Sequence, residues 1–368
     1  MSSPGAAASS RSAPAASAAS GGPRYMPYGD PARVLGTIAV VVQHVCDVPF
    51  FDMKKTPEAD WWIVNFLDAS CRWAVPVYIM LSGALLLDPA RQEPAGAFYR
   101  KRLARLGIPI IFWSAAYSLL AVYYTGWSTP EQAWRDLALG KPYIHLHFVF
   151  RIAGLYAFTP MLRLFLAHAS HKMVVQTVAI LLGFSVANTV TEAFVASELT
   201  AFVRFFPFLG FYLLGYLLRE HRVSRRTAIA CLLLYLACAA FLASGTGLLI
   251  GAFGFRPFPS PAMLLYDFTS PLRIVMGVCA WLILVRIFDE RWLETRIGQI
   301  TRKHIAPATL GIYLIHLVFR EILHMNGITA ASFPLWIGIP VVSLAVYAAS
   351  VASTMAIMRI PFVRKIVI

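Results

Sequence analysis

Charged residues are scarce in this sequence of 368 residues: Asp, Glu, Lys and Arg together make up 14%, whereas ordinary globular domains contain roughly 25%. Hydrophobic residues make up 58%, and the mean hydropathy is +0.65. A single core surrounded by water cannot bury that much apolar surface, so a soluble protein is excluded and lipid must be the solvent for most of it. The composition predicts an all-α, polytopic membrane protein.

Acidic residues and cysteines are also few. The 18 Asp and Glu against 32 Lys and Arg give a net charge of +14. In a soluble protein this excess would suggest nucleic-acid binding, but in a membrane protein it first marks topology, and we expect no nucleic-acid partner. The five cysteines are odd in number and lie mostly in apolar runs, so we expect packing residues rather than disulfides. The sequence has no glycine-rich phosphate loop and no internal repeat of the kind found in two-fold transporters.

The beginning of the chain lacks a long hydrophobic run. Of the first 24 residues, 21 are Ala, Ser, Gly or Pro, and such a segment cannot bury enough apolar surface to offset its chain entropy. We expect residues 1–28 to form a disordered cytoplasmic tail without a signal peptide, and residues 29–368 to form the membrane domain.

Ten apolar segments follow, each long enough to cross about 30 Å of hydrocarbon as a helix. They lie near residues 33–51, 72–88, 105–124, 146–166, 173–194, 202–218, 228–250, 266–288, 306–324 and 334–358. With the amino terminus in the cytoplasm, the strongly basic loops all fall on the cytoplasmic side. Their basic residues are Arg91, Arg100, Lys101, Arg102, Arg105, Arg219, Arg222, Arg225, Arg226, Arg286, Arg291, Arg296, Arg302, Lys303, Arg359, Arg364 and Lys365. All of these loops can lie on one side only if the number of membrane helices is even, so we expect both termini to be cytoplasmic.

The first apolar segment contains the ionisable residues that are most expensive to keep in a membrane. Asp30 precedes a proline and is expected to cap the helix at the cytoplasmic interface. Arg33 and His44 are eleven residues apart, which is three helical turns plus about 20°, so they share one face about 16 Å apart, with His44 near the midplane. Asp47 lies one turn further and can orient the imidazole. The alternatives are a hydrogen-bonded packing histidine and a solvated carboxylate at the outer helix end.

The Arg33-to-His44 spacing resembles the signature of the acyltransferase-3 family of integral membrane acyltransferases. Further matching segments include Val75-Pro76, Leu81-Ser82-Gly83, Tyr99 to Arg105, Pro109, Trp113, His145-Leu146, Leu155-Tyr156, Pro160, Phe208-Leu209-Gly210, Gly215-Tyr216 and Tyr313 to His316. The sequence looks most similar to the stand-alone, ten-helix branch that includes enterobacterial common antigen O-acetyltransferase. Two residues depart from the family pattern: His147, where relatives often carry Trp, and Arg273, where an uncharged residue is expected.

The resemblance implies transfer of an acyl group, most often acetyl, from acyl-CoA to a hydroxyl of a surface or exported polysaccharide or its lipid-linked precursor. His44 is then the expected general base, with Arg33 and Asp47 as further catalytic residues, because a neutral imidazole can remove the proton of an alcohol. The phosphates of coenzyme A cannot enter hydrocarbon and should stay at the cytoplasmic surface. The residues expected to bind them are Arg33, Arg100, Lys101, Arg102 and Arg105.

The remaining candidate site residues are expected to bind the acceptor or the thioester. They are Arg72, Ser82, His145, His147, Arg151, Tyr156 and His316. Arg72 is expected at the outer start of the second helix, and Ser82 has none of the surroundings of a covalent nucleophile. We expect no tightly bound cofactor, with acyl-CoA acting as co-substrate. We expect no metal site, because His145 and His147 lack Cys or carboxylate companions.

The resemblance also implies a multi-pass protein of the bacterial inner membrane, in contact with membrane lipid and with other polysaccharide-assembly proteins. A transporter or exporter of glycan or acyl groups, in which Arg33, His44 and Asp47 form a relay, is the alternative from another class. The membrane-bound O-acyltransferases known as MBOAT also use an intramembrane histidine, but they lack the Arg-to-His spacing on the first helix. Consumption of acyl-CoA separates an enzyme from a transporter.

Overall fold

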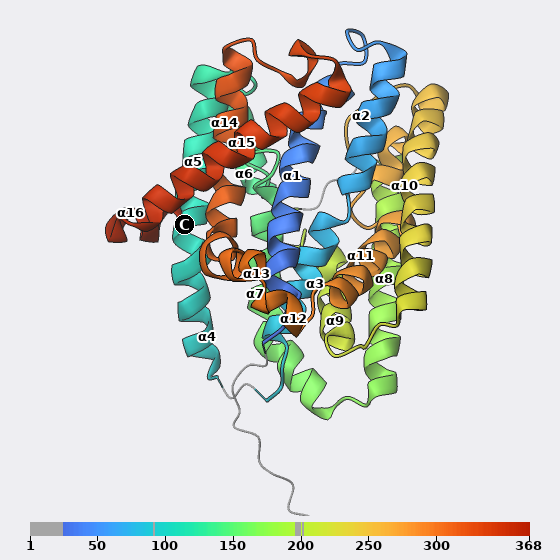
Figure 1. Cartoon of the computed structure of the whole chain (residues 1–368), viewed down its shortest axis with the longest axis vertical. Helices are drawn as coiled ribbons and strands as arrows, with labels where there is room; N and C mark the ends of the chain where they lie inside the picture. The colour runs from blue at the N-terminus through green and yellow to red at the C-terminus, as the bar shows by residue number, and fades with distance from the viewer. Residues whose placement is uncertain (1–24, 91–92, 196–199, 201) are drawn as a thin grey trace, which may run out of the picture.

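The computed structural model describes residues 25–90, 93–195, 200 and 202–368, and within these ranges it contains helices and no strand (Figure 1). The α-helices are α1 (Gly29–Phe51), α2 (Glu58–Cys71), α3 (Ala74–Leu86), α4 (Ala95–Arg102), α5 (Ile108–Leu119), α6 (Pro130–Ala138), α7 (His147–His168), α8 (His171–Val195), α9 (Leu209–Leu218), α10 (Arg225–Phe253), α11 (Pro271–Ile287), α12 (Glu290–Glu294), α13 (Arg296–Ile300), α14 (Thr309–Met325), α15 (Leu335–Met358) and α16 (Pro361–Val367). Short 3₁₀ and π segments join several of them into longer helical stretches. The predicted all-α, polytopic membrane fold is confirmed.

Nine helical stretches of the described residues are long and apolar enough to span a membrane. They are Gly29–Phe51, Glu58–Leu86, Ala95–Tyr124, His147–His168, His171–Val195, Arg225–Phe253, Pro261–Ile287, Arg296–Met325 and Leu335–Met358. Each of the ten predicted segments contains a helix, but the segment at 202–218 forms only the shorter apolar helix Phe206–Leu218. At 1.5 Å per residue, this helix crosses only part of the hydrocarbon.

The second predicted segment, 72–88, was wrong in its start. The helical stretch begins at Glu58, and α2 and α3 form one span that is interrupted next to Arg72. Hydropathy missed α2 because it contains the polar residues Asn65 and Asp68, which are both buried. Asn65 donates a hydrogen bond of 2.9 Å to the carbonyl oxygen of Ala243, and Asp68 forms an ion pair with Arg72. Protein groups pair with both side chains, so the span does not need an apolar sequence throughout.

The short helix α9 packs against α3 through two glycines. A Cβ atom added at Gly83 would lie 1.8 Å from the carbonyl oxygen of Tyr212, and one added at Gly215 would lie 1.8 Å from the carbonyl oxygen of Met80. Only glycine permits this approach of two backbones. Close backbone contact stabilises α9 inside the bundle although it is too short to be a lipid-facing span.

Several of the predicted basic loops gather at one end of the bundle. Tyr28 donates a hydrogen bond of 3.0 Å to the carbonyl oxygen of Arg219, and the Arg219 guanidinium lies 3.7 Å from the Asp88 carboxylate. The Arg302 guanidinium lies over the ring of Tyr25, 4.5 Å from its centroid. The start of α1, the ends of α3 and α9 and the segment before α14 therefore meet at one end. That this end and both termini face the cytoplasm stays a prediction.

Some predictions fall wholly or partly outside the described residues. These are Arg91 and residues 1–24 of the predicted tail. The five cysteines are described and are free thiols, of which three are buried.

Candidate active site

Two cavities lie toward opposite ends of α1 and α14. The His44 cavity, about 860 Å³, is lined by the end of α1, the start of α7, the end of α14 and the loops before α7 and α11. The Arg33 cavity, about 400 Å³, is lined by the start of α1, the end of α3, the first half of α7 and the start of α14. Helix α1 contributes polar side chains to both cavities, which makes it the central element of the site.

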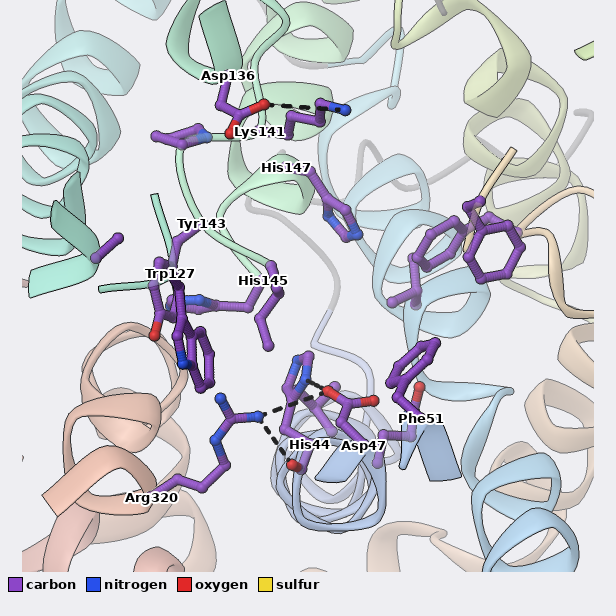
Figure 2. A pocket seen from close by; sticks show the side chains of 18 of the residues that line it. His44, Asp47, Phe51, Trp127, Asp136, Lys141, Tyr143, His145, His147 and Arg320 are labelled. Atoms are coloured by element: carbon purple, nitrogen blue, oxygen red, sulfur yellow. Dashed lines mark hydrogen bonds and ion pairs between the residues drawn. The ribbon is translucent and has the colours of Figure 1, made fainter. Parts of the chain in front are cut away.

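His44, Asp47 and Arg320 converge at the wall of the His44 cavity (Figure 2). His44 and Asp47 are one helical turn apart on α1, so their side chains are neighbours, and His44 Nδ1 lies 2.7 Å from Asp47 Oδ2. Arg320 reaches the pair from α14: its Nη1 lies 3.7 Å from Asp47 Oδ2 and donates a hydrogen bond of 3.0 Å to the carbonyl oxygen of His44. Both groups of the pair are mostly buried, with side-chain exposures of 17% and 19%.

The contact with Asp47 assigns the tautomer of His44. An ionised carboxylate oxygen can only accept a hydrogen bond, so Nδ1 carries a hydrogen, and in the neutral form of the imidazole the lone pair is on Nε2. Nε2 makes no hydrogen bond within the described part of the chain, and His44 lines the cavity. In this arrangement Nε2 is the nitrogen that faces the cavity free to exchange a proton with a substrate.

Two more histidines surround His44. The ring centroids of His145 and His316 lie 6.3 and 5.3 Å from that of His44. Backbone carbonyls orient both rings: His145 Nε2 donates to Leu314 at 3.3 Å, and His316 Nδ1 donates to Tyr313 at 2.6 Å. His145 lines the His44 cavity, whereas His316 is completely buried and lines neither cavity.

Arg33 lies at the other end of α1, in the Arg33 cavity, and Asp30 positions it. Arg33 Nη1 donates a hydrogen bond of 2.6 Å to Asp30 Oδ1, and the Tyr25 hydroxyl donates one of 2.7 Å to Asp30 Oδ2. Burial, together with the Asp30 carboxylate, raises the pKa of Tyr25 to about 12, so the phenol remains a donor at neutral pH. The predicted N-cap was wrong: α1 begins at Gly29, and Asp30 lies inside the first turn and pairs with Arg33. An acidic side chain in the first turn also interacts favourably with the helix dipole.

Tyr313 is the one residue that lines both cavities within the described ranges. Its hydroxyl donates a hydrogen bond to the carbonyl oxygen of His145, and the Tyr78 hydroxyl donates one of 2.7 Å to the carbonyl oxygen of Arg33. Arg33 and His44 were predicted on one face of α1, and both face the protein interior. They open into different cavities that meet at Tyr313.

The predicted basic cluster is divided between the Arg33 cavity and the surface. Arg102 and Arg105 line the cavity, whereas Arg100 and Lys101 do not. Successive helical residues are rotated by 100°, so neighbours in sequence cannot all face one cavity. Lys101 instead forms an ion pair of 2.6 Å with Glu93. The structure thus does not bring Arg100 and Lys101 to the cavity with Arg33.

Arg72 was predicted at the outer start of a helix, and this placement was wrong. It lies between α2 and α3, inside the span Glu58–Leu86, and only 8% of its surface is exposed. The Asp68 carboxylate pairs with it, and its guanidinium lies 4.3 Å from the centroid of the Tyr266 ring. Arg72 lines the His44 cavity with its charge already balanced.

The other predicted substrate residues divide between the two cavities. Ser82 and Tyr156 line the Arg33 cavity, and His147 and Arg151 line the His44 cavity. Among the described residues, Ser82 makes no hydrogen bond to a general base, so the geometry gives it no activated hydroxyl.

Arg320 and Glu321 are not among the site residues predicted from the sequence. They form a buried ion pair on α14, and Arg320 also reaches Asp47 of the pair on α1. Two adjacent charges inside an apolar segment, four residues after His316, were a usable signal, because intramembrane charges mark functional sites. Trp127 and Tyr143, which also line the His44 cavity, had no comparable signal in the sequence.

No group of three or more His, Cys, Asp or Glu side chains in the described ranges could hold a metal ion.

The fold and the site define a polytopic helical membrane protein in which a hydrogen-bonded histidine faces a polar cavity. The family model of the acyltransferase-3 family, described as an acyltransferase domain, matches residues 28–359, so the chain belongs to this family and is an integral membrane acyltransferase. No curated protein and no solved structure matches the chain.

Proposed function

We propose that this acyltransferase transfers an acetyl group from acetyl-CoA to a hydroxyl of a surface or exported polysaccharide, or of its lipid-linked precursor, with His44 as the general base. The observation that carries the proposal is the 2.7 Å contact between His44 Nδ1 and Asp47 Oδ2, which leaves Nε2 available in a polar cavity. A base must lie within hydrogen-bond reach of the proton that it removes, and the cavity of about 860 Å³ admits a sugar to that position.

The Arg33 cavity supports binding of the donor. Four arginines line it and provide charge for the phosphates of coenzyme A, whereas Asp30 is the only described carboxylate among the lining residues; the arginines are Arg33, Arg102, Arg105 and Arg302. The nucleotide would remain at this end, and the acyl-pantetheine arm would extend past Tyr313 toward His44, a distance of about 16 Å along α1. Arg33 would therefore bind the donor rather than touch the reacting atoms.

The reaction follows from these placements. Nε2 of His44 accepts the proton of the acceptor hydroxyl while the hydroxyl oxygen attacks the carbonyl carbon of the thioester. The carbon–sulfur bond breaks, its electron pair goes to sulfur, and the imidazolium returns the proton to the departing thiolate. Asp47 stabilises the imidazolium that forms in between. The products are an ester on the glycan and CoA thiol, without a covalent acyl-enzyme.

The same proposal places the protein in the bacterial inner membrane, as a member of the stand-alone O-acetyltransferase branch. The donor end would face the cytoplasm and the His44 cavity would face outward, where an exported glycan is accessible. Other polysaccharide-assembly proteins would supply the acceptor and receive the product.

Release of CoA thiol tests the proposal. The purified protein in lipid nanodiscs receives acetyl-CoA labelled in the acetyl group, together with a membrane fraction that contains lipid-linked glycans. We expect thiol release that depends on the glycan, with label in an alkali-labile ester, and loss of both in His44→Gln. In the transporter alternative, labelled substrate would cross the membrane of proteoliposomes intact and no thiol would be released.

A further inference from the structure

Arg151, near the start of α7, is a buried cation that forms no ion pair with a carboxylate of the described residues. Its exposed fraction is 7%, and its Nε and Nη1 atoms are buried and have no hydrogen-bond partner among the described residues. Of the other arginines that line the His44 cavity, Arg72 and Arg320 pair with carboxylates and Arg204 donates to the carbonyl oxygen of Leu139. Among the described residues, no carboxylate lies within 4.0 Å of the Arg151 guanidinium. A desolvated charge without an ion-pair partner is costly unless a ligand supplies the missing hydrogen bonds and the opposite charge.

The aromatic surroundings of Arg151 hold the guanidinium in place but do not neutralise it. Its Cζ lies 4.6 Å from the ring centroid of Phe208 and 4.4 Å from that of Phe268. Arg273 adds a second guanidinium 4.3 Å from the centroid of Phe268, and the His147 ring meets the same phenyl group edge-on at 5.0 Å. Two cations and an imidazole thus contact one phenyl ring, and cation–π contacts compensate only part of the desolvation of an arginine.

Two acidic side chains of the cavity, Asp267 and Glu192, lie within electrostatic range of Arg151, but neither forms an ion pair with it. Asp267 Oδ1 accepts hydrogen bonds from the Thr189 hydroxyl at 2.7 Å and from the Thr269 amide at 2.9 Å. Asp47 is occupied by His44 and Arg320. The protein therefore presents a fixed, planar donor group in the wall of the reaction cavity, and an oxyanion is the ligand that fits it.

We infer that Arg151 binds an anionic group of the acceptor, so that the acceptor is an acidic saccharide or a sugar linked to a phosphate. The inference rests on the proposed function, because it identifies the substrate class of the same cavity. Arg151 binds the oxyanion through an N–H donor that the described residues leave without a partner, and the neighbouring hydroxyl of the sugar is thereby presented to His44. Arg273 adds a second positive charge beside Phe268 and so favours an anionic residue over a neutral one of similar shape.

Equilibrium binding to the whole protein in nanodiscs tests the inference without requiring turnover. The probes are a tetrasaccharide containing glucuronic acid, its carboxyl-reduced neutral counterpart, and a short-chain polyprenyl phosphate. We expect one of the two anionic probes to bind at least about tenfold more tightly than the neutral one, which is the magnitude of a charge-assisted hydrogen bond. Preference for the carboxylate indicates an acidic sugar, and preference for the phosphate indicates a lipid-linked precursor.

Three variants separate binding from folding. Arg151→Gln should lose the preference for the anion, Arg151→Lys should keep part of it, and Arg256→Gln, which removes an exposed charge outside the cavity, should keep all of it. The melting temperature of Arg151→Gln should equal or exceed that of the wild type, because an unpaired buried charge is removed. A large fall in melting temperature for both Arg151 variants would mean a structural role and would overturn the inference.

The outcomes also distinguish this inference from the proposed function. Equal binding of the anionic and neutral probes, with glycan-dependent release of CoA thiol intact, would refute the anion site and leave the transferase in place. Anion-selective binding that depends on Arg151, without any thiol release, would support the site and refute acyl transfer.

Discussion

Replacing Asp47 by asparagine isolates the contribution of the His44–Asp47 pair, because asparagine has nearly the same shape and lacks the charge. The carboxylate accepts a hydrogen bond of 2.7 Å from His44 Nδ1 and is partly buried. A hydrogen bond to a charged group contributes about 1.5–3 kcal/mol, which corresponds to a fall in kcat of about 10- to 150-fold. An amide that turned its NH₂ toward Nδ1 would also select the opposite tautomer and place the hydrogen on Nε2.

The His44→Gln variant gives the reference value of kcat for complete loss of the base. His44→Gln should lower kcat by about 10²- to 10⁴-fold, the usual contribution of general base catalysis. Both variants should leave the KM for acetyl-CoA close to its wild-type value, since the four arginines proposed to bind the donor line a separate cavity. Initial rates of CoA thiol release, measured in nanodiscs with a saturating glycan acceptor, provide both constants. His171→Gln, which changes an exposed histidine at the start of α8, is the control.

The double variant His44→Gln/Asp47→Asn decides whether Asp47 acts through the imidazole. If it does, the double variant is no slower than His44→Gln alone, because the effects of groups that act as one unit are not additive. A further tenfold loss in the double variant would give Asp47 an independent role. Wild-type kcat in His44→Gln would remove His44 as the base and refute the reasoning.

Three further outcomes follow from packing and charge. Arg320→Met should lower the free energy of unfolding by about 3–5 kcal/mol, because it leaves the buried Glu321 carboxylate unpaired. In thermal unfolding, the double variant Arg320→Met/Glu321→Leu should recover most of that stability, but it should not recover the transferase activity. Gly83→Ala should lower the free energy of unfolding by at least about 2 kcal/mol, because the added Cβ meets a backbone oxygen. At Gly183 an added Cβ meets nothing within 4 Å, so Gly183→Ala should melt at or above the wild-type temperature. Arg102→Gln should raise the KM for acetyl-CoA by about tenfold with little change in kcat, as expected for loss of a phosphate contact; an unchanged KM would remove Arg102 from the donor site.

Some features of the site follow from local rules and were predictable. The pairing of His44 with Asp47 depends on a spacing of three residues in one helix, and the common orientation of Arg33 and His44 depends on a spacing of eleven. Hydropathy located the apolar segments because lipid imposes one length on every span. It failed at α2, whose polar residues are paired inside the protein, and at α9, whose short length is stabilised by glycine contacts with α3.

The amino-acid sequence by itself thus determined that the chain is a helical membrane protein and that one helix carries a guanidinium and an imidazole on the face turned inward, because composition and helical rotation are local properties. Only the tertiary structure decided that Arg320, 276 residues away in the chain, donates to the carbonyl oxygen of His44, that Tyr313 lines both cavities, and that Arg151 lines one of them without an ion pair to a described carboxylate. These contacts join residues of different helices, and no spacing along the chain encodes which helices become neighbours.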